Sequence, residues 1–311
     1  MNRITWFFTR MAIIGAIVLT GLGCVQEDFD RCPRATRVYF SFARETSFGG
    51  VRSEETIGRI DLYAFDEAGK IAGYWVDDQV AMNENYYIEI DSLAAGNYHL
   101  VAWTNLGTRY VANVQPGDRQ PSREEMNISL ALPADRTLRD LSLPHLYFGE
   151  CRGASVGTFG EERLVVVLED NLYKLNFEVE GIEPSDDTYQ FTVTDNNGAY
   201  TFANNYGEMP AFRYASSARF NGTDPLSASM TVLRLDENRT PALTFTNETS
   251  GQVLFSHDNL VNLILQANTQ GATIDFRATR EFYIKLRVHA DASVTITING
   301  WELETEEVQV S

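Results

Sequence analysis

Short runs in which apolar and polar residues alternate fill the chain after residue 36, and Val, Ile, Thr, Tyr and Phe dominate these runs. Side chains that are β-branched or aromatic favour extended backbone, and a period of two residues puts one face of a strand against a core. Residues 36–43, for example, read TRVYFSFA, and residues 281–290 read EFYIKLRVHA. The pattern predicts an all-β protein.

The spacing of strands and turns is typical of β-sandwiches. We expect two sandwich domains, 36–168 and 169–311, that meet at the sequence LEDNLY, and we find no short fixed repeat. Residues 107–139 are polar and contain prolines, so we expect them to run over the surface with a helical turn near 122–126. Residues 85–90 and 96–106 should form an antiparallel pair. The expected strands are 36–43, 57–66, 71–76, 85–90, 96–106, 145–150, 163–169, 172–182, 188–205, 228–236, 241–247, 252–268, 281–290 and 293–304.

The chain is strongly acidic, with 25 basic and 43 acidic residues among 311 and a formal net charge of −18. Such a field repels phosphate backbones, which argues against a nucleic-acid partner. It also opposes loose adsorption to anionic lipid, so attachment to a membrane should be covalent or hydrophobic.

Residues 1–23 have the pattern of a secretory signal peptide. Arg3 and Arg10 give a positive start, and residues 11–22 form an apolar segment that is short for a transmembrane helix. An uncleaved membrane anchor and an ordinary signal peptide cut at small residues are the alternatives. No later segment is long and apolar enough to span a bilayer.

Small residues precede Cys24 and acidic residues follow soon after it, an arrangement that resembles the lipobox of bacterial lipoproteins. In that class the cysteine thiol takes a diacylglyceryl group and becomes the new N-terminus. The match is imperfect, because Gly21 stands where leucine is usual and Leu22 comes one position late. Buried acyl chains contribute about 0.8 kcal/mol per methylene, so two or three chains attach a protein durably. We predict lipidation at Cys24, with residues 24–35 as a tether.

The acidic residues 25–30 of this tether, VQEDFD, have two interpretations. They resemble the export signal that sends some lipoproteins to the outer face of the outer membrane. They would equally make a solvated linker.

With Cys24 lipidated, Cys32 and Cys151 remain as an even pair in an oxidising compartment. We predict a disulfide between them, which would fasten the tether to the end of the first domain. In the chain-entropy model a loop of this length contributes about 4–5 kcal/mol, less any strain. The alternative is two unpaired thiols.

No pattern of residues in the sequence indicates catalysis. The four histidines form no zinc motif, and the chain has no Walker or GxGxxG sequence. Pro241 stands where a calcium loop starting at Asp236 would need glycine. His99 lies in an alternating run and His145 follows a proline, so we expect a half-buried and a packing role. We expect no enzyme activity, no metal, and no cofactor beyond the covalent lipid on Cys24.

Six segments carry a resemblance to a known family: IDLYAFDEAGKIAGYWV, LAAGNYHLVAWTNL, LYFGE, RLVVVLEDNLYKLNFEVEGI, YQFTVTDNNGAYTF and SVTITINGW. In their order and spacing, over most of the chain from Cys24 to Trp301, they resemble the fimbrillin-associated anchor lipoproteins of Gram-negative bacteria. The resemblance implies two transthyretin-like β-sandwich domains. It also implies a subunit that holds the base of a fimbrium in the outer membrane, with a fimbrial shaft subunit as its partner.

Pilin sandwiches of this class polymerise by strand exchange, in which a strand of one subunit fills a groove in its neighbour. In shaft subunits of the related family, cleavage after an arginine removes the first strand. Here a cut after Arg44 or Arg52 would separate the lipid at Cys24 from the fold, unless the predicted Cys32–Cys151 disulfide held the piece. The resemblance therefore implies an anchor that keeps its first strand, ends the polymer and limits its length.

The end of the chain is a candidate donor strand for the shaft subunit. Within residues 302–311, Leu303, Val308 and Val310 are the candidate pocket residues. A frayed acidic terminus is the alternative. Trp301 is expected to close a core at the end of a strand.

Two other functions fit the same sequence. One is a lipidated adhesin or stalk subunit, in which exposed aromatics such as Tyr74, Trp75 or Tyr206 contact a host or glycan ligand. The other is a surface lipoprotein that binds or processes glycans, against which the missing acid–base pattern counts. The sequence specifies neither the fimbrial system nor a receptor.

Overall fold

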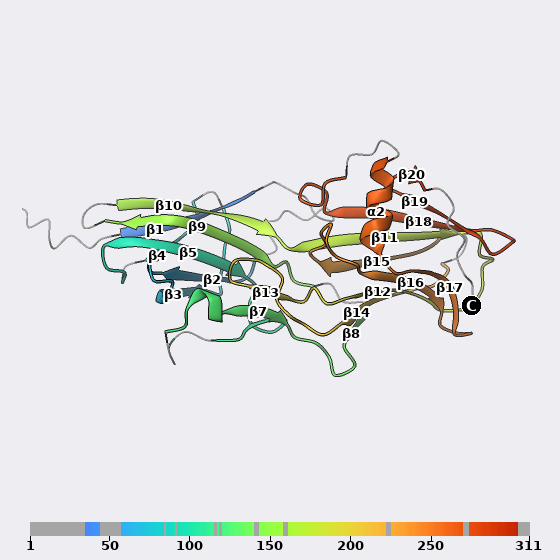
Figure 1. The fold of residues 1–311 in the computed structure, drawn as a ribbon, viewed down its shortest axis with the longest axis horizontal. Helices are drawn as coiled ribbons and strands as arrows, with labels where there is room; N and C mark the ends of the chain where they lie inside the picture. Colours follow the sequence, from blue (N-terminus) through green and yellow to red (C-terminus); the bar gives the residue numbers. More distant parts are fainter. Residues whose placement is uncertain are drawn as a thin grey trace, which may run out of the picture.

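The computed structural model shows an elongated molecule whose described part consists mostly of β-strands (Figure 1). The predicted signal peptide, Cys24 and Cys32 lie outside the described part. Among the helices within it, none has the length and apolar character needed to cross a bilayer. The described residues are 35–43, 57–83, 85–90, 92–114, 117, 120–139, 143–157, 161–221, 225–269 and 274–303.

The N-terminal half forms a seven-stranded sheet with the order β3-β2-β5-β9-β10-β1-β4. In it β1 runs parallel to β10 and antiparallel to β4, and the other neighbours are antiparallel. The strands predicted at 36–43, 57–66 and 71–76 are confirmed as β1, β2 and β3. The strands of the sheet are β1 (Ala35–Phe42), β2 (Ile60–Phe65), β3 (Ile71–Asp77), β4 (Tyr87–Ile90), β5 (Gly96–Thr104), β9 (Tyr147–Val156) and β10 (Glu161–Asp170).

The predicted pairing of residues 85–90 with 96–106 is wrong. β4 pairs with β1, where Ile88 lies opposite Val38, and β5 lies between β2 and β9. Ile88 of β4 is buried in the same cluster as Val38 and Phe40 of β1. Side-chain burial, and not closeness along the chain, therefore decides which strand β4 joins.

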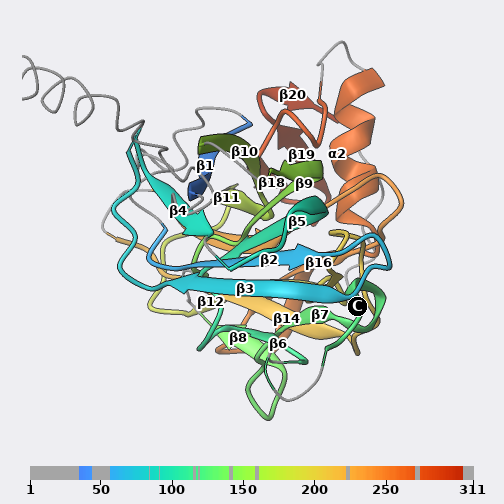
Figure 2. The same cartoon turned by 90° about the vertical axis from the view of Figure 1, so that its left-hand side faces the viewer.

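Two five-stranded sheets and one three-stranded sheet complete the fold, with the orders β15-β11-β18-β19-β20, β17-β16-β12-β14-β8 and β13-β7-β6. Viewed end-on, the sheets are layered and the helix α2 (Leu260–Thr269) stands at one side (Figure 2). The strands are β6 (Tyr110–Ala112), β7 (Asn127–Leu130), β8 (Thr137–Arg139), β11 (Leu172–Glu180), β12 (Tyr189–Asp195), β13 (Ala199–Thr201), β14 (Phe212–Ala218), β15 (Leu226–Leu233), β16 (Ala242–Asn247), β17 (Gln252–His257), β18 (Glu281–Val288), β19 (Val294–Ile298) and β20 (Trp301–Glu302).

The expectation of one strand over residues 252–268 is confirmed for the first part of this range and wrong for the second. β17 ends at His257 and the helix α2 follows. The Asn259 side chain accepts a 2.9 Å hydrogen bond from the Asn262 N–H, as an N-cap does. The buried residues then recur with helical spacing, at Leu260, Val261, Leu263, Ile264 and Ala267.

The strands β2 and β5 each contribute to two cores. Leu62 of β2 packs in a cluster whose buried members all belong to the first half of the chain, whereas its neighbour Tyr63 packs in a larger cluster. In β5, Ala102 likewise packs in the first cluster and its neighbour Trp103 in the larger one. We call the first cluster the N-terminal core and the second the shared core. The N-terminal core comprises Val38, Phe40, Ile57, Ile60, Leu62, Ala64, Ile88, Ile90, Leu93, Leu100, Ala102, Tyr147, Ala154, Val156, Val166 and Leu168.

The two halves of the chain exchange short strands where they meet. β8 of the first half pairs in parallel with β14 of the second, and β13 of the second half pairs with β7 of the first. Phe202, just after β13, is fully buried with its ring 4.9 Å from that of Tyr63 and 6.3 Å from that of Trp103. The halves therefore share backbone hydrogen bonds as well as the shared core.

The expectation that residues 107–139 run over the surface is wrong in part. It supplies β6, β7 and β8, and it buries Tyr110, Ile128 and Leu130 in the shared core. The helical turn expected within it is confirmed as η3 (Arg123–Glu125), where the Ser122 N–H donates a 2.6 Å hydrogen bond to Glu125.

The chain passes from the seven-stranded sheet to a five-stranded sheet at Asn171, between the end of β10 and the start of β11. This position lies inside the predicted boundary at 168–173. The division into two separate domains stays a prediction, because the shared core contains residues from Tyr63 to Leu303.

Candidate functional site

The first strand, β1, is fully integrated into its sheet. It pairs over eight positions with β10, from Ala35 to Phe42, and on its other side with β4. Val38 is 0% and Phe40 is 8% exposed. Loss of β1 would leave β4 without a strand partner, free one edge of β10 and open the N-terminal core. The candidate cleavage sites Arg44 and Arg52 lie outside the described residues.

Of the three cysteines, the structure describes only Cys151, in β9. Its side chain is half-buried against the N-terminal core, burial raises the pKa of its thiol, and the thiol forms no disulfide with any residue that the structure describes. Since Cys32 lies outside the described residues, the Cys32–Cys151 disulfide stays a prediction. The same holds for lipidation of Cys24.

The end of the described chain differs from the sequence expectation. Trp301 is 41% exposed, so its predicted role as a core plug is wrong. Leu303 takes that place: it is 4% exposed in the shared core, and its N–H donates a 2.8 Å hydrogen bond to the Ile296 carbonyl. Because Leu303 fills the core of its own chain, it is not available to a neighbouring subunit in this arrangement. Val308 and Val310 lie outside the described residues, and a donor role for the tail stays a prediction.

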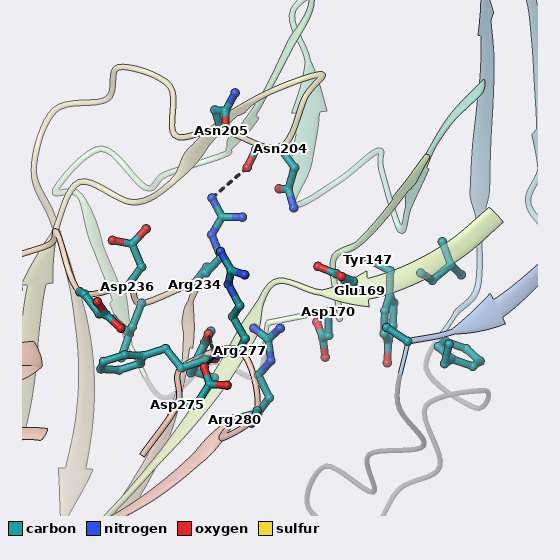
Figure 3. A pocket seen from close by; sticks show the side chains of 18 of the residues that line it. Tyr147, Glu169, Asp170, Asn204, Asn205, Arg234, Asp236, Asp275, Arg277 and Arg280 are labelled. Atoms are coloured by element: carbon teal, nitrogen blue, oxygen red, sulfur yellow. Dashed lines mark hydrogen bonds between the residues drawn. The ribbon is translucent and has the colours of Figure 1, made fainter. Parts of the chain in front are cut away.

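A cleft of about 1020 Å³ lies where the two halves of the molecule meet (Figure 3). The end of β1, the start of β9 and the end of β10 line one side of it, including Phe42, Tyr147 and Asp170. The loops after β13 and β15 and the loop before β18 line the other side. The cleft therefore exists only because the two halves are joined.

Three arginines point into this cleft: Arg234 from the loop after β15, and Arg277 and Arg280 from the loop before β18 (Figure 3). The Arg234 guanidinium donates a 2.9 Å hydrogen bond to the Asn204 carbonyl. The Arg280 guanidinium lies over the Tyr173 ring, 4.8 Å from its centre. Within the described part of the chain, no ion pair involves any of the three arginines. The sequence interpretation missed this cluster, because loops far apart in the chain bring it together.

The carboxylates of the cleft serve the chain's own turns and contacts. Asp170 pairs with His145 and accepts a 3.0 Å hydrogen bond from the first N–H of β11. Asp236 accepts a 2.9 Å hydrogen bond from the backbone N–H two positions later, and Asp275 accepts one of 2.8 Å from the Arg277 N–H. These side chains hold the loops in place, and among the described residues they form no ion pair with the three guanidinium groups.

No group of three or more His, Cys, Asp or Glu side chains in the described ranges is placed to hold a metal ion. His99 in β5 is half-buried, with ring nitrogens 2.9 Å from Glu150 and 2.7 Å from Arg123. Burial, as the largest cause, lowers the pKa of His99. His145 stacks on Tyr147. The half-buried position expected of His99 and the packing role expected of His145 are both confirmed.

The aromatic residues considered as adhesin contacts are not fully exposed. Tyr74 is half-buried and its hydroxyl donates a 2.6 Å hydrogen bond to buried Asp61, and Trp75 packs against the N-terminal core. Tyr206 is also half-buried, under the guanidinium of Arg234 at 4.5 Å. All three side chains therefore have structural partners within the chain.

A family model described as the fimbrillin-A associated anchor proteins Mfa1 and Mfa2 matches residues 29–307. The chain belongs to this family of fimbrial anchor proteins, which is a class of structural proteins and not an enzyme family.

Among individual proteins, the chain is similar to the minor fimbrium anchoring subunit Mfa2 of Porphyromonas gingivalis, with 22% identity over 303 residues that cover 92% of this chain and 90% of that protein. The solved structure of the fimbrial anchor protein Mfa2 from Porphyromonas gingivalis matches with a TM-score of 0.71 and 21% identity over 88% of this chain and 100% of that one. A candidate adhesin of Bacteroides thetaiotaomicron matches with a TM-score of 0.70 and 20% identity over 88% and 99%. These structures share the fold.

Proposed function

We propose that this chain is an outer-membrane lipoprotein that anchors the base of a fimbrium to the cell surface. The family to which it belongs, and its similarity to an anchoring subunit, support this proposal. Acyl chains on Cys24 would hold the protein in the membrane, and residues 25–34 would form the tether to β1. Two or three acyl chains provide durable attachment where one does not.

The single observation that carries the proposal is the position of β1 between β10 and β4. An anchor must keep lipid, tether and fold on one chain under tension. A first strand that pairs along its length with β10, and over Thr36–Tyr39 also with β4, resists extraction, because many bonds must break together. An uncleaved β1 would also leave no open groove, so the subunit would end the polymer and limit its length.

The contact with the shaft subunit would be strand exchange, in which main-chain hydrogen bonds provide strength and alternate side chains provide register. The segment offered to the neighbour would follow Leu303, with Val308 and Val310 as its pocket residues, because Leu303 itself is buried in this chain. The exchange of strands between the two halves would pass tension from this end of the chain to the tether.

The test is Cys24→Ala, with Cys151→Ala as the matched cysteine control. The Cys24→Ala protein should leave the membrane fraction, and cells that carry it should shed long fimbriae into the medium. The Cys151→Ala protein should stay in the membrane, with fimbriae of normal length. Unchanged fractionation and processing of Cys24→Ala would contradict the lipid anchor. Attached fimbriae of normal length that adhere poorly would point instead to an adhesin.

A further inference from the structure

We propose that the cleft between the two halves binds an acidic sugar, whose carboxylate would lie on Arg234, Arg277 and Arg280 and whose hydroxyls would meet the surrounding acceptors. This ligand site goes beyond the anchoring function and does not depend on it.

The first argument is that the three guanidinium groups lack paired acceptors. They point into one space, yet within the described residues no carboxylate pairs with them. Arg234 Nε and Arg280 Nη1 are buried and have no hydrogen-bond partner among these residues. Buried donors without partners are costly, and converging like charges repel one another. A ligand carboxylate placed against the guanidinium groups would supply charged acceptors for these donors.

The second argument is that the loop of Arg277 and Arg280, and the side chain of Arg234, are held in place before any ligand arrives. The loop that carries Arg277 and Arg280 is tied to β11, because the Tyr173 hydroxyl bonds to the Phe276 carbonyl and the Lys174 N–H bonds to the Arg280 carbonyl at 2.8 Å. The Asn204 carbonyl fixes Arg234 from the opposite loop. Groups that are already ordered lose less entropy on binding.

The third argument separates a sugar acid from a simple polyanion. Glu169, Asp170, Asp236, Glu237 and Asp275 also line the cleft, so a phosphate-rich ligand would meet more negative groups than positive ones. A ligand with one carboxylate per unit and several hydroxyls fits better, because carboxylate oxygens accept hydrogen bonds from hydroxyls. The volume of about 1020 Å³ suits a short oligosaccharide.

The test uses the full-length protein in detergent micelles and isothermal titration calorimetry. The probes are trimers of galacturonic acid and of glucuronic acid, and the control ligands are the same trimers with every carboxyl methyl-esterified. Esterification removes the charge and keeps the ring and hydroxyls. At least one acid trimer should bind, and its ester should bind at least about ten-fold more weakly, as expected for a charge-assisted hydrogen bond.

The matched variants are Arg277→Gln and Arg219→Gln. Arg277 is exposed in the cleft, so its replacement should leave the unfolding midpoint unchanged and weaken binding about ten-fold. Arg219 is exposed in the loop after β14, outside the cleft, and its replacement should leave binding unchanged.

Failure of both acid trimers to bind, or equal binding of acid and ester, would overturn the proposal. Equal loss of binding in both variants would overturn the assigned location. Binding of triglutamate as tight as that of the acid trimers would show that hydroxyls are not recognised and would point to an acidic peptide instead. None of these results depends on Cys24, so failure here is distinguishable from failure of the anchoring proposal.

Discussion

The N-terminal core and the shared core lie against the same seven-stranded sheet but differ in what they join. The buried members of the N-terminal core run only from Val38 to Leu168, and β1 and β4 close it at one edge. The shared core collects side chains from both halves, and Phe202 of the second half reaches Tyr63 and Trp103 of the first. One core is local and the other joins the molecule together.

This difference separates two kinds of damage. Loss of β1 should open the local core and leave the junction intact, whereas damage at the junction should weaken both halves together. An anchor needs both: β1 connects the fold to the tether, and the junction connects the two ends of the molecule.

The largest effect is expected for Phe202→Ala in the shared core. Removing a fully buried aromatic side chain should lower the free energy of unfolding by about 3–5 kcal/mol, in a single transition that affects both halves. Denaturant unfolding followed by circular dichroism measures this. Tyr283→Ala is the control, because Tyr283 is 58% exposed and its loss should change stability by less than about 0.5 kcal/mol. Two separate transitions, or a loss below about 1 kcal/mol, would contradict the joining role.

A smaller and local effect is expected for Phe40→Ala in β1. Its side chain is 8% exposed at the edge of the N-terminal core, so its removal should lower the free energy of unfolding by about 3 kcal/mol. Hydrogen exchange should accelerate in β1 and β4 and stay unchanged in β11 and β18. The neighbouring Tyr39→Ala, on the outer face of the same strand, is the matched control and should cost about 1 kcal/mol or less. Equal acceleration in all four strands would remove the distinction between the cores.

A still smaller effect is expected at Asn171, the residue between β10 and β11. It is 1% exposed, and its side-chain amide donates a 3.0 Å hydrogen bond to the Asn204 side chain. Asn171→Ala leaves the Asn204 side chain without this partner and should lower the free energy of unfolding by about 1–2 kcal/mol, as measured by chemical denaturation. Asn205→Ala, at an exposed neighbouring position, should be near neutral. Identical midpoints for the two variants would show that this amide pair does not couple the halves.

The smallest effect concerns pH. Burial lowers the pKa of His99, which faces Glu150, Arg123 and Arg152, so the folded protein binds the proton less readily than the unfolded chain. The contribution of His99 to the free energy of unfolding is complete when the pH is above 6.5, the ordinary pKa of histidine. This contribution is lost as the pH falls from 6.5 toward the lowered pKa of the folded state. His99→Gln should therefore flatten the decline of the unfolding free energy below pH 6.5, relative to the unmodified protein. A steeper decline in the variant would contradict the assigned direction.

The strands were predictable from the sequence, because period-two alternation of β-branched and aromatic residues depends only on neighbours. The helix α2 was predictable in principle, since Leu260, Val261, Leu263 and Ile264 follow helical spacing, but the apolar run before it resembles a strand. The partner of β4 was not predictable locally, because the burial of Ile88 beside Val38 depends on the folded sheet.

The sites were less accessible from the sequence than the fold. The three cleft arginines come from two loops separated by some 40 residues, and they are brought together because β15 and β18 both pair with β11. Residues 107–139 were misjudged because their apolar residues are sparse, yet Tyr110 and Ile128 are both fully buried. Trp301 was expected in the core but is exposed, and Leu303 is buried in its place. The turn at Asn299 and Gly300, just before β20, decides which of the two side chains faces the core.

The most direct test of the anchoring account is intact-mass spectrometry of the mature protein isolated from cell membranes. The account predicts one chain that begins at Cys24, carries the lipid, and still contains residues 35–42 of β1. A mature chain that begins after Arg44 or Arg52, without lipid and without β1, would contradict it.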